Sequence, residues 1–159
     1  MSREVESYQR FIFGTIDSLV QSLEGLTEAE LNWRPAAPDT NSLYAIAAHV
    51  LGNAEENVLQ TVCGQAVMRS RPAELAARGS TWEPLRDHWR DLRGRIEQAL
   101  AALPDAELGR SRHHPRRGPL EAREVLLVVA RHAAEHWGEA QLTRSLLGAE
   151  QRATAARSR

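Results

Sequence analysis

Four long segments of this chain carry apolar residues at helical spacing, and turn-forming residues separate them. The segments span residues 3–23, 41–63, 80–103 and 119–147. Apolar residues at every third or fourth position form one stripe along an α-helix, and that stripe is buried by packing against another element. Strand-like alternation is short throughout the chain. We therefore predict an all-α fold, a four-helix bundle with short extra helices in its connections.

Capping signals indicate where several of these helices begin. Thr27 followed by Glu30 forms a capping box for one short helical turn. A second short helix is expected around residues 73–77. Asn41 or Ser42 can cap the second long helix, because either side chain can accept a hydrogen bond from a backbone amide of the first turn. The connections are therefore expected to hold only short elements.

The length of the chain favours one domain. At 159 residues and 17.7 kDa it is long enough to bury a sizeable core. Gly148 is expected to cap the end of the fourth helix. We therefore predict a single bundle domain over residues 1–148. The remaining residues, 149–159, form a polar C-terminal tail that we expect to be disordered.

Composition excludes several classes of function. The formal net charge is −1, which gives no reason to expect nucleic acid or an anionic membrane as a partner. All 20 basic residues are arginine, which excludes a Schiff-base lysine and a P-loop lysine. Cys63 is the only cysteine, so no intrachain disulfide can form. The N-terminus does not resemble a signal peptide, and we predict a cytoplasmic protein.

Three histidines carry the strongest functional signal. His132 and His136 are four residues apart on the fourth helix, which places both imidazoles on one face, one turn apart. His49 on the second helix could complete a three-histidine metal site with open coordination positions, an arrangement more typical of catalytic than of structural zinc. A helical wheel places all three at the edge of an apolar stripe, accessible to solvent. Spacing alone leaves open that they are only packed or solvated residues.

Two other metal sites can be weighed on the sequence. The run from His132 to His136 matches H-x-x-E-H, the inverted zincin signature, with Glu135 as general base. Those proteases take a third ligand from a helix well downstream, and only 23 residues follow His136. A ferritin-like di-iron centre needs an E-x-x-H motif on each of two helices, and the chain has none. The three-histidine site is therefore the preferred metal site.

No single acid–base residue stands out around these histidines, so the catalytic residues stay unknown. Glu56, Glu135 and Glu139 are candidates only because they share helical turns with the histidines. Trp33 and Trp137 are the two tryptophans that could form a wall of a pocket beside a metal.

A second histidine pair lies outside the long helices. His113 and His114 stand beside Arg116 and Arg117 in a polar segment that we expect to be a loop. We interpret them as solvated loop histidines. Contacts with an anionic ligand are the alternative.

Two sequence runs resemble the DinB/YfiT-like superfamily of metal-binding four-helix bundles. They are NWRPAAPDTNSLYAIAAHVLGNAEE and RHAAEHWGEAQLTRSLLG, and the resemblance covers residues 10–148. The family pattern has one ligand histidine on the second helix and H-x-x-x-H on the fourth, positions that His49, His132 and His136 occupy. Glu139 departs from the pattern, because Gly-Gln is frequent where this chain has Gly138-Glu139.

The resemblance implies one divalent ion, Zn, Ni, Fe or Mn, held by the three histidines. It further implies an enzyme that acts on a small-molecule substrate, a thiol-dependent S-transferase or isomerase with a low-molecular-weight thiol as cosubstrate. The alternatives are a hydrolase that uses metal-bound water and a non-catalytic metal-binding protein of the stress response. Members of the family are often homodimers. Whether this chain is an enzyme at all is left open by its sequence.

Overall fold

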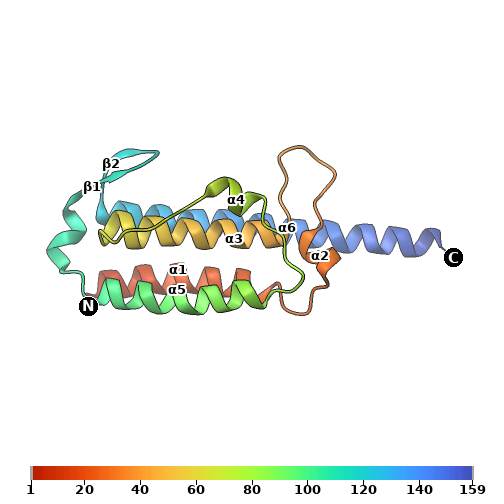
Figure 1. Cartoon of the computed structure of the whole chain (residues 1–159), viewed down its shortest axis with the longest axis horizontal. Helices are drawn as coiled ribbons and strands as arrows, with labels where there is room; N and C mark the ends of the chain where they lie inside the picture. Colours follow the sequence, from red (N-terminus) through yellow and green to blue (C-terminus); the bar gives the residue numbers. More distant parts are fainter. Residues whose placement is uncertain (1, 159) are drawn as a thin grey trace.

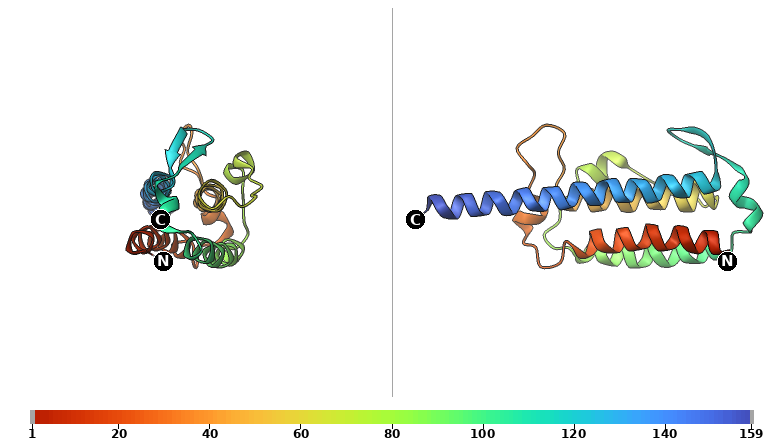
Figure 2. Two further views of the ribbon diagram at one scale, coloured as in Figure 1. Left: turned by 90° about the vertical axis from the view of Figure 1, so that its left-hand side faces the viewer. Right: turned by 180° about the vertical axis from the view of Figure 1, so that it is seen from behind.

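Four long helices form two layers in the computed structural model, which describes residues 2–158 (Figures 1 and 2). One layer holds α1 (Arg3–Gln21) and α5 (Glu83–Ala101). The other holds α6 (Ala122–Arg157) and α3 (Leu43–Ala54), which the π-helix η1 (Glu55–Val62) continues. Figure 1 shows that α1 and α6 run in one direction and α3 and α5 in the other. Helix makes up 69% of the chain, and the prediction of an all-α bundle is confirmed.

Short elements fill the connections between the long helices. They are α2 (Glu28–Asn32), α4 (Arg71–Leu75), the 3-10 helix η2 (Asp105–Gly109), and the strands β1 (Ser111–His114) and β2 (Gly118–Glu121). The predicted capping box begins α2, because the Thr27 backbone N–H donates to Glu30 Oε2 over 2.8 Å and the Thr27 hydroxyl accepts from the Glu30 amide. Ser42, one of the two expected caps, begins α3. The two short helices α2 and α4 lie close to where the sequence predicted them, α2 from its capping box and α4 near residues 73–77.

The hairpin β1–β2 corrects the sequence prediction, which expected no strands and a loop in this segment. The two strands pair antiparallel, with Ser111 opposite Glu121 and His114 opposite Gly118. The turn is closed by a hydrogen bond from the Arg117 amide to the His114 carbonyl, and Gly118 has a φ of 74°. Strands of four residues are too short to show a recognisable alternation, and for this reason the sequence pattern missed them.

The helix α6 also differs from the prediction. It continues through Gly148 to Arg157, whereas we expected a cap at Gly148 and a disordered tail. The residues after Gly148 are mostly alanine and arginine, which favour helix. This last part of α6 extends beyond the bundle (Figure 1). Among residues 2–158, no helix is both long enough and apolar enough to cross a lipid bilayer.

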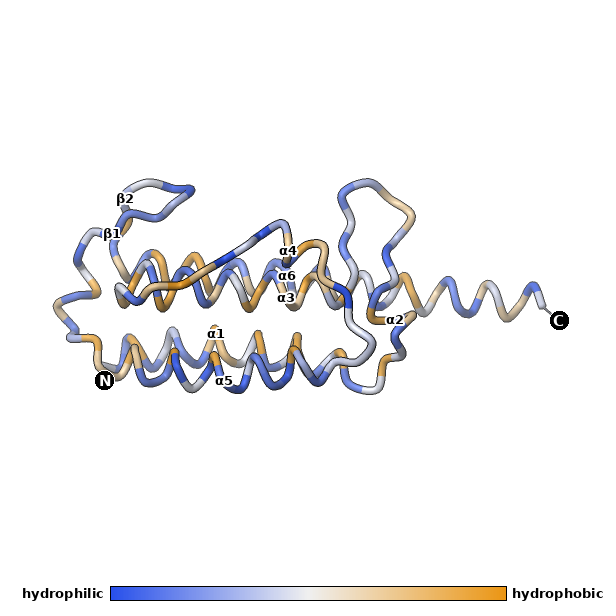
Figure 3. The backbone as a smooth tube through the Cα atoms, in the orientation of Figure 1, coloured by the Kyte–Doolittle hydropathy of each residue, from blue (hydrophilic) through white to orange (hydrophobic). Residues whose placement is uncertain are grey.

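The core lies between the two layers, where apolar residues face inward (Figure 3). Burial is most complete on α3, where ten of the twelve residues are buried. This helix is contacted by α1, α2, α5 and α6, and α4 covers its remaining face. As a result His49 is only 4% exposed, and the expectation of a solvent-accessible position for it is wrong. Because other elements cover α3 on every side, this helix lacks the solvent-exposed face that a helical wheel assumes.

Candidate metal centre

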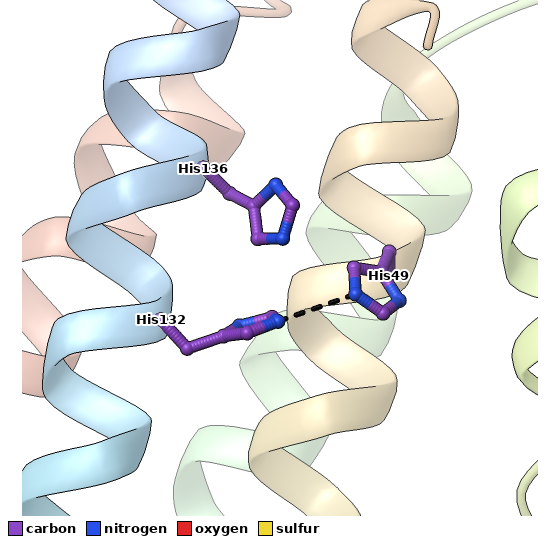
Figure 4. A group of neighbouring side chains, drawn as sticks. All are labelled: His49, His132 and His136. Atoms are coloured by element: carbon purple, nitrogen blue, oxygen red, sulfur yellow. Dashed lines mark hydrogen bonds between the residues drawn. The ribbon is translucent and has the colours of Figure 1, made fainter. Parts of the chain in front are cut away.

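The three predicted histidines converge between α3 and α6 (Figure 4). His132 Nε2 lies 3.2 Å from His49 Nε2. The ring centroids of His132 and His136 are 4.4 Å apart, as expected for side chains one helical turn apart. Each residue offers one ring nitrogen, and the three nitrogens lie within 4.8 Å of one another. The fold thus gathers three imidazole nitrogens from two helices.

Carboxylates hold two of these imidazoles by their outer nitrogens. His49 Nδ1 lies 2.9 Å from Glu74 Oε2, and His136 Nδ1 lies 2.7 Å from Glu139 Oε2. An ionised carboxylate only accepts hydrogen bonds, so each Nδ1 carries the proton and each Nε2 keeps its lone pair. Histidines that ligate metals are typically oriented by carboxylates in this way. The two rings are therefore in the tautomer that a metal ion requires.

The spacing of the nitrogens fits a metal ion. Two imidazole nitrogens bound at about 2.1 Å to one tetrahedral ion lie about 3.4 Å apart. The observed 3.2 Å between His49 Nε2 and His132 Nε2 is close to that value. Imidazole suits Zn, Ni, Fe and Mn to different degrees, so the donors do not identify the metal. Three histidines alone would leave coordination positions for other ligands.

Burial keeps His49 and His132 uncharged. It lowers the pKa of His132 to about 3, and it is also the main cause of the lowered pKa of His49. The hydrogen bond from His136 lowers the pKa of Glu139. For Glu74, burial alone would raise the pKa, but hydrogen bonds from Arg69 and His49 outweigh it and lower the pKa. At neutral pH His49 and His132 are therefore neutral imidazoles, and Glu74 and Glu139 are ionised carboxylates.

Arg69 connects the centre to the segment between η1 and α4. Its side chain is 5% exposed and lies between two carboxylates, with Nε 2.7 Å from Glu74 Oε1 and Nη1 2.6 Å from Glu56 Oε2. The guanidinium therefore fixes the carboxylate that fixes His49. Sequence reasoning missed Arg69 and Glu74, because they lie in a connection and no periodic pattern indicates which way a short helix faces.

The histidines open on a cavity of about 370 Å³. His49 and Asn53 line it from α3, and Val128, His132 and His136 from α6. The start of α4 and the turn of the β1–β2 hairpin complete the lining. A cavity of this size takes a small molecule rather than a polymer.

Comparison with known proteins identifies the family to which this chain belongs. A model of the DinB superfamily matches residues 14–140. The chain belongs to the DinB superfamily. No curated protein matches it.

Two solved structures share the DinB fold of this chain at low sequence identity. A conserved protein from Enterococcus faecalis has a TM-score of 0.72 and 16% identity, covering 92% of this chain and 98% of its own. A DinB-like protein from Bacillus cereus has a TM-score of 0.70 and 19% identity, covering 90% of this chain and 92% of its own. At these identities the likeness supports the fold alone.

The three acid–base candidates that share helical turns with the histidines lie in different surroundings. Glu139 contacts His136. Glu135 is 58% exposed and pairs with Arg131 on the outer face of α6. Glu56 pairs with arginines instead of a histidine. Of the three, only Glu139 is hydrogen-bonded to a histidine of the candidate centre.

Neither candidate tryptophan lines the histidine cavity. Trp137 borders a surface hollow beside Ser22, and Trp33 borders another beside Leu147. The expectation that they form a pocket wall at the metal is therefore wrong.

His113 and His114 differ from each other. His113 is exposed, as expected of a loop residue, but His114 is 2% exposed and lines the histidine cavity. Its Nδ1 accepts a hydrogen bond of 3.1 Å from the Arg116 amide. The interpretation of His114 as a solvated residue is wrong, because the hairpin folds this strand against the bundle.

Replacing Glu74 by glutamine is expected to weaken metal binding about 10- to 100-fold, the usual cost of losing a carboxylate behind a ligand histidine. The amide keeps the shape of the side chain but offers one weaker acceptor to His49 Nδ1. Competition titration with a chromophoric chelator measures the change. Glu135→Gln, on the exposed face of α6, is the matched control and should bind as the wild type does. Equal affinities for the two variants would contradict the role of Glu74.

The metal-free protein is expected to lose stability as the pH falls below the ordinary histidine value of 6.5. Unfolded His132 takes up a proton near that pH, whereas folded His132 has a pKa of about 3. Between these two pH values the unfolded state binds more protons than the folded state does. The free energy of unfolding therefore decreases as the pH is lowered, by up to about 1.4 kcal/mol per pH unit for each such histidine. Urea midpoints in EDTA at about pH 7 and about pH 5 measure this. His132→Gln should show a shallower dependence, and an unchanged dependence would contradict the assignment.

Proposed function

We propose that His49, His132 and His136 bind one divalent metal ion and that the centre is the active site of an enzyme acting on a small molecule. The observation that carries the proposal is the convergence of three imidazoles, two of them held by carboxylates with Nε2 free. Membership of the DinB superfamily, which is generally metal-binding, supports it.

An enzyme is favoured over a structural metal site by the cavity. A structural zinc ion is closed by four protein ligands, whereas three histidines would leave positions open. The cavity of about 370 Å³ lies directly on those histidines, so a substrate has room beside the ion. A divalent ion in such a site lowers the pKa of a bound thiol or water and so supplies a nucleophile near neutral pH.

A small-molecule thiol is the cosubstrate that we propose, as in a thiol-dependent S-transferase or isomerase. The protein's own thiol is unsuited to the role. Cys63 lines a different hollow, beside Glu107 and Arg112, and burial raises its pKa to about 11. A thiol that reacts at the histidines would therefore come from outside the chain. A hydrolase would use the same centre with water in place of the thiol.

Metal analysis of untagged protein tests the binding step. Protein incubated with Zn, Ni, Fe or Mn salts and then dialysed is expected to retain one equivalent of at least one ion, measured by inductively coupled plasma mass spectrometry. His88→Ala, an exposed histidine on α5, is the control and should retain the same amount. Retention of none of the ions by the wild type would refute the proposal.

Cobalt substitution tests whether the centre accepts a thiol. Addition of 2-mercaptoethanol to the cobalt-loaded protein is expected to produce a thiolate-to-cobalt charge-transfer band in the near ultraviolet. The band requires an open coordination position, so an unchanged spectrum in a fully loaded protein would favour a closed structural site and contradict the enzyme.

A further inference from the structure

Three arginines gather at the cavity that the histidines share. Arg71 lies at the start of α4, and Arg116 and Arg117 lie in the turn of the hairpin. Within residues 2–158, neither Arg71 nor Arg117 has a carboxylate at ion-pair distance. Arg116 has one contact, 3.3 Å from Nη2 to Glu56 Oε2, an oxygen that Arg69 already holds at 2.6 Å. The mouth of the cavity therefore carries positive charge that the protein does not neutralise.

The hairpin holds two of these arginines in place. The buried His114 ring accepts the Arg116 amide, and the His114 carbonyl accepts the Arg117 amide. Gly118 follows with a positive φ, which an L side chain would rarely adopt. The backbone at the turn is thus anchored beside the cavity, so both arginine side chains start from fixed backbone positions next to it.

Asn53 provides a second, independent sign of a polar ligand. It lies one helical turn after His49, lines the cavity and is 4% exposed. Its Oδ1 has no hydrogen-bond partner among the residues that the structure describes. An unpaired buried amide oxygen costs about 1–3 kcal/mol, and such groups in native proteins are commonly partnered by a ligand or water. The cavity therefore has an unused hydrogen-bond acceptor near the histidines and unused cationic donors at its mouth.

We infer that the cavity binds a small organic oxyanion, with its carboxylate or phosphate group held by Arg71, Arg116 and Arg117 and its reactive end toward the three histidines. This inference rests on the proposed metal-dependent function and adds the charge of the substrate. Guanidinium forks match carboxylate and phosphate oxygens, often with two hydrogen bonds. A cationic molecule would meet the unpaired arginines and is excluded.

Pairs of thiols that differ only in charge test the inference. The probes are mercaptoacetate, 3-mercaptopropionate and 4-mercaptobutyrate, each compared with its neutral amide by calorimetric titration into zinc-loaded protein. At least one carboxylate is expected to bind about tenfold more tightly than its amide, the usual strength of a charged hydrogen bond. The double variant Arg71→Gln/Arg117→Gln should lose this preference. Arg90→Gln on α5, outside the cavity, should keep it.

Separate readouts distinguish the possible failures. The metal content of each variant is measured first, the titrations use a retained ion where zinc is not retained, and a wild type that retains none of Zn, Ni, Fe or Mn refutes the proposed function itself. Zinc-loaded protein that binds every carboxylate and amide equally overturns the oxyanion inference and leaves the metal centre standing. A preference that survives in the double variant overturns it as well. Acetate and inorganic phosphate are then added as competitors. If either one competes, the result supports an oxyanion site and indicates whether it prefers a carboxylate or a phosphate. If neither competes, the result contradicts the oxyanion site.

Discussion

Replacing His132 by alanine is expected to abolish tight metal binding while the bundle stays folded. His132 lies close to both other histidines, with Nε2 3.2 Å from His49 Nε2 and its ring centroid 4.4 Å from that of His136. Its loss leaves two ligands from different helices. The affinity should fall by more than the roughly 100-fold that loss of a supporting carboxylate can cost. Alanine is a strong helix former, so α6 should persist.

Two measurements separate a lost ligand from a lost fold. Competition titration against a chromophoric chelator gives the affinity for the ion, and far-ultraviolet circular dichroism gives the helix content. His88→Ala is the matched control, because His88 is 42% exposed and lies on α5, the long helix diagonally opposite α6 (Figure 2). If His132→Ala folded and bound metal as tightly as His88→Ala, the three-histidine site would be rejected.

The long helices and the histidine cluster were predictable because the spacing of apolar residues in the sequence indicates which face of a helix is buried. A residue at every third or fourth position is enough to indicate the buried face of a long helix. The same period places His132 and His136 on one face, and the family pattern adds His49. Predicting the histidine cluster required only the face that each of two helices turns toward the other. That face stays the same when the predicted helix ends are wrong by a few residues.

The surroundings of the histidines were not predictable in the same way. Glu74 reaches His49 from 25 residues away through a short helix whose orientation depends on the connection before it. Burial of His49 follows from α4 lying over α3, a tertiary contact that a helical wheel cannot contain. The hairpin that brings His114 and Arg117 to the cavity has strands too short to produce a pattern. The contacts that the connecting segments make with the histidines could therefore be identified only from the structure.

Replacing Arg69 by methionine is expected to cost about 3–5 kcal/mol of folding free energy, the usual cost of removing one partner from a buried ion pair. Methionine keeps much of the apolar stem but leaves the carboxylates of Glu56 and Glu74 together, at side-chain exposures of 16% and 12%. Arg116, at 3.3 Å, partly compensates Glu56 alone. Urea unfolding of the metal-free protein measures the loss.

The control is Arg95→Met, which breaks a pair of similar length at the surface. Arg95 Nη1 lies 2.7 Å from Glu55 Oε1, but the Arg95 side chain is 41% exposed, so the expected cost is below about 1 kcal/mol. Because the loss at Arg69 comes from an uncompensated charge, adding Glu74→Gln to Arg69→Met should recover part of the stability. If Arg69→Met cost no more than Arg95→Met, the buried guanidinium would not be what holds Glu74. The support of His49 would then come from the packing of α4 alone.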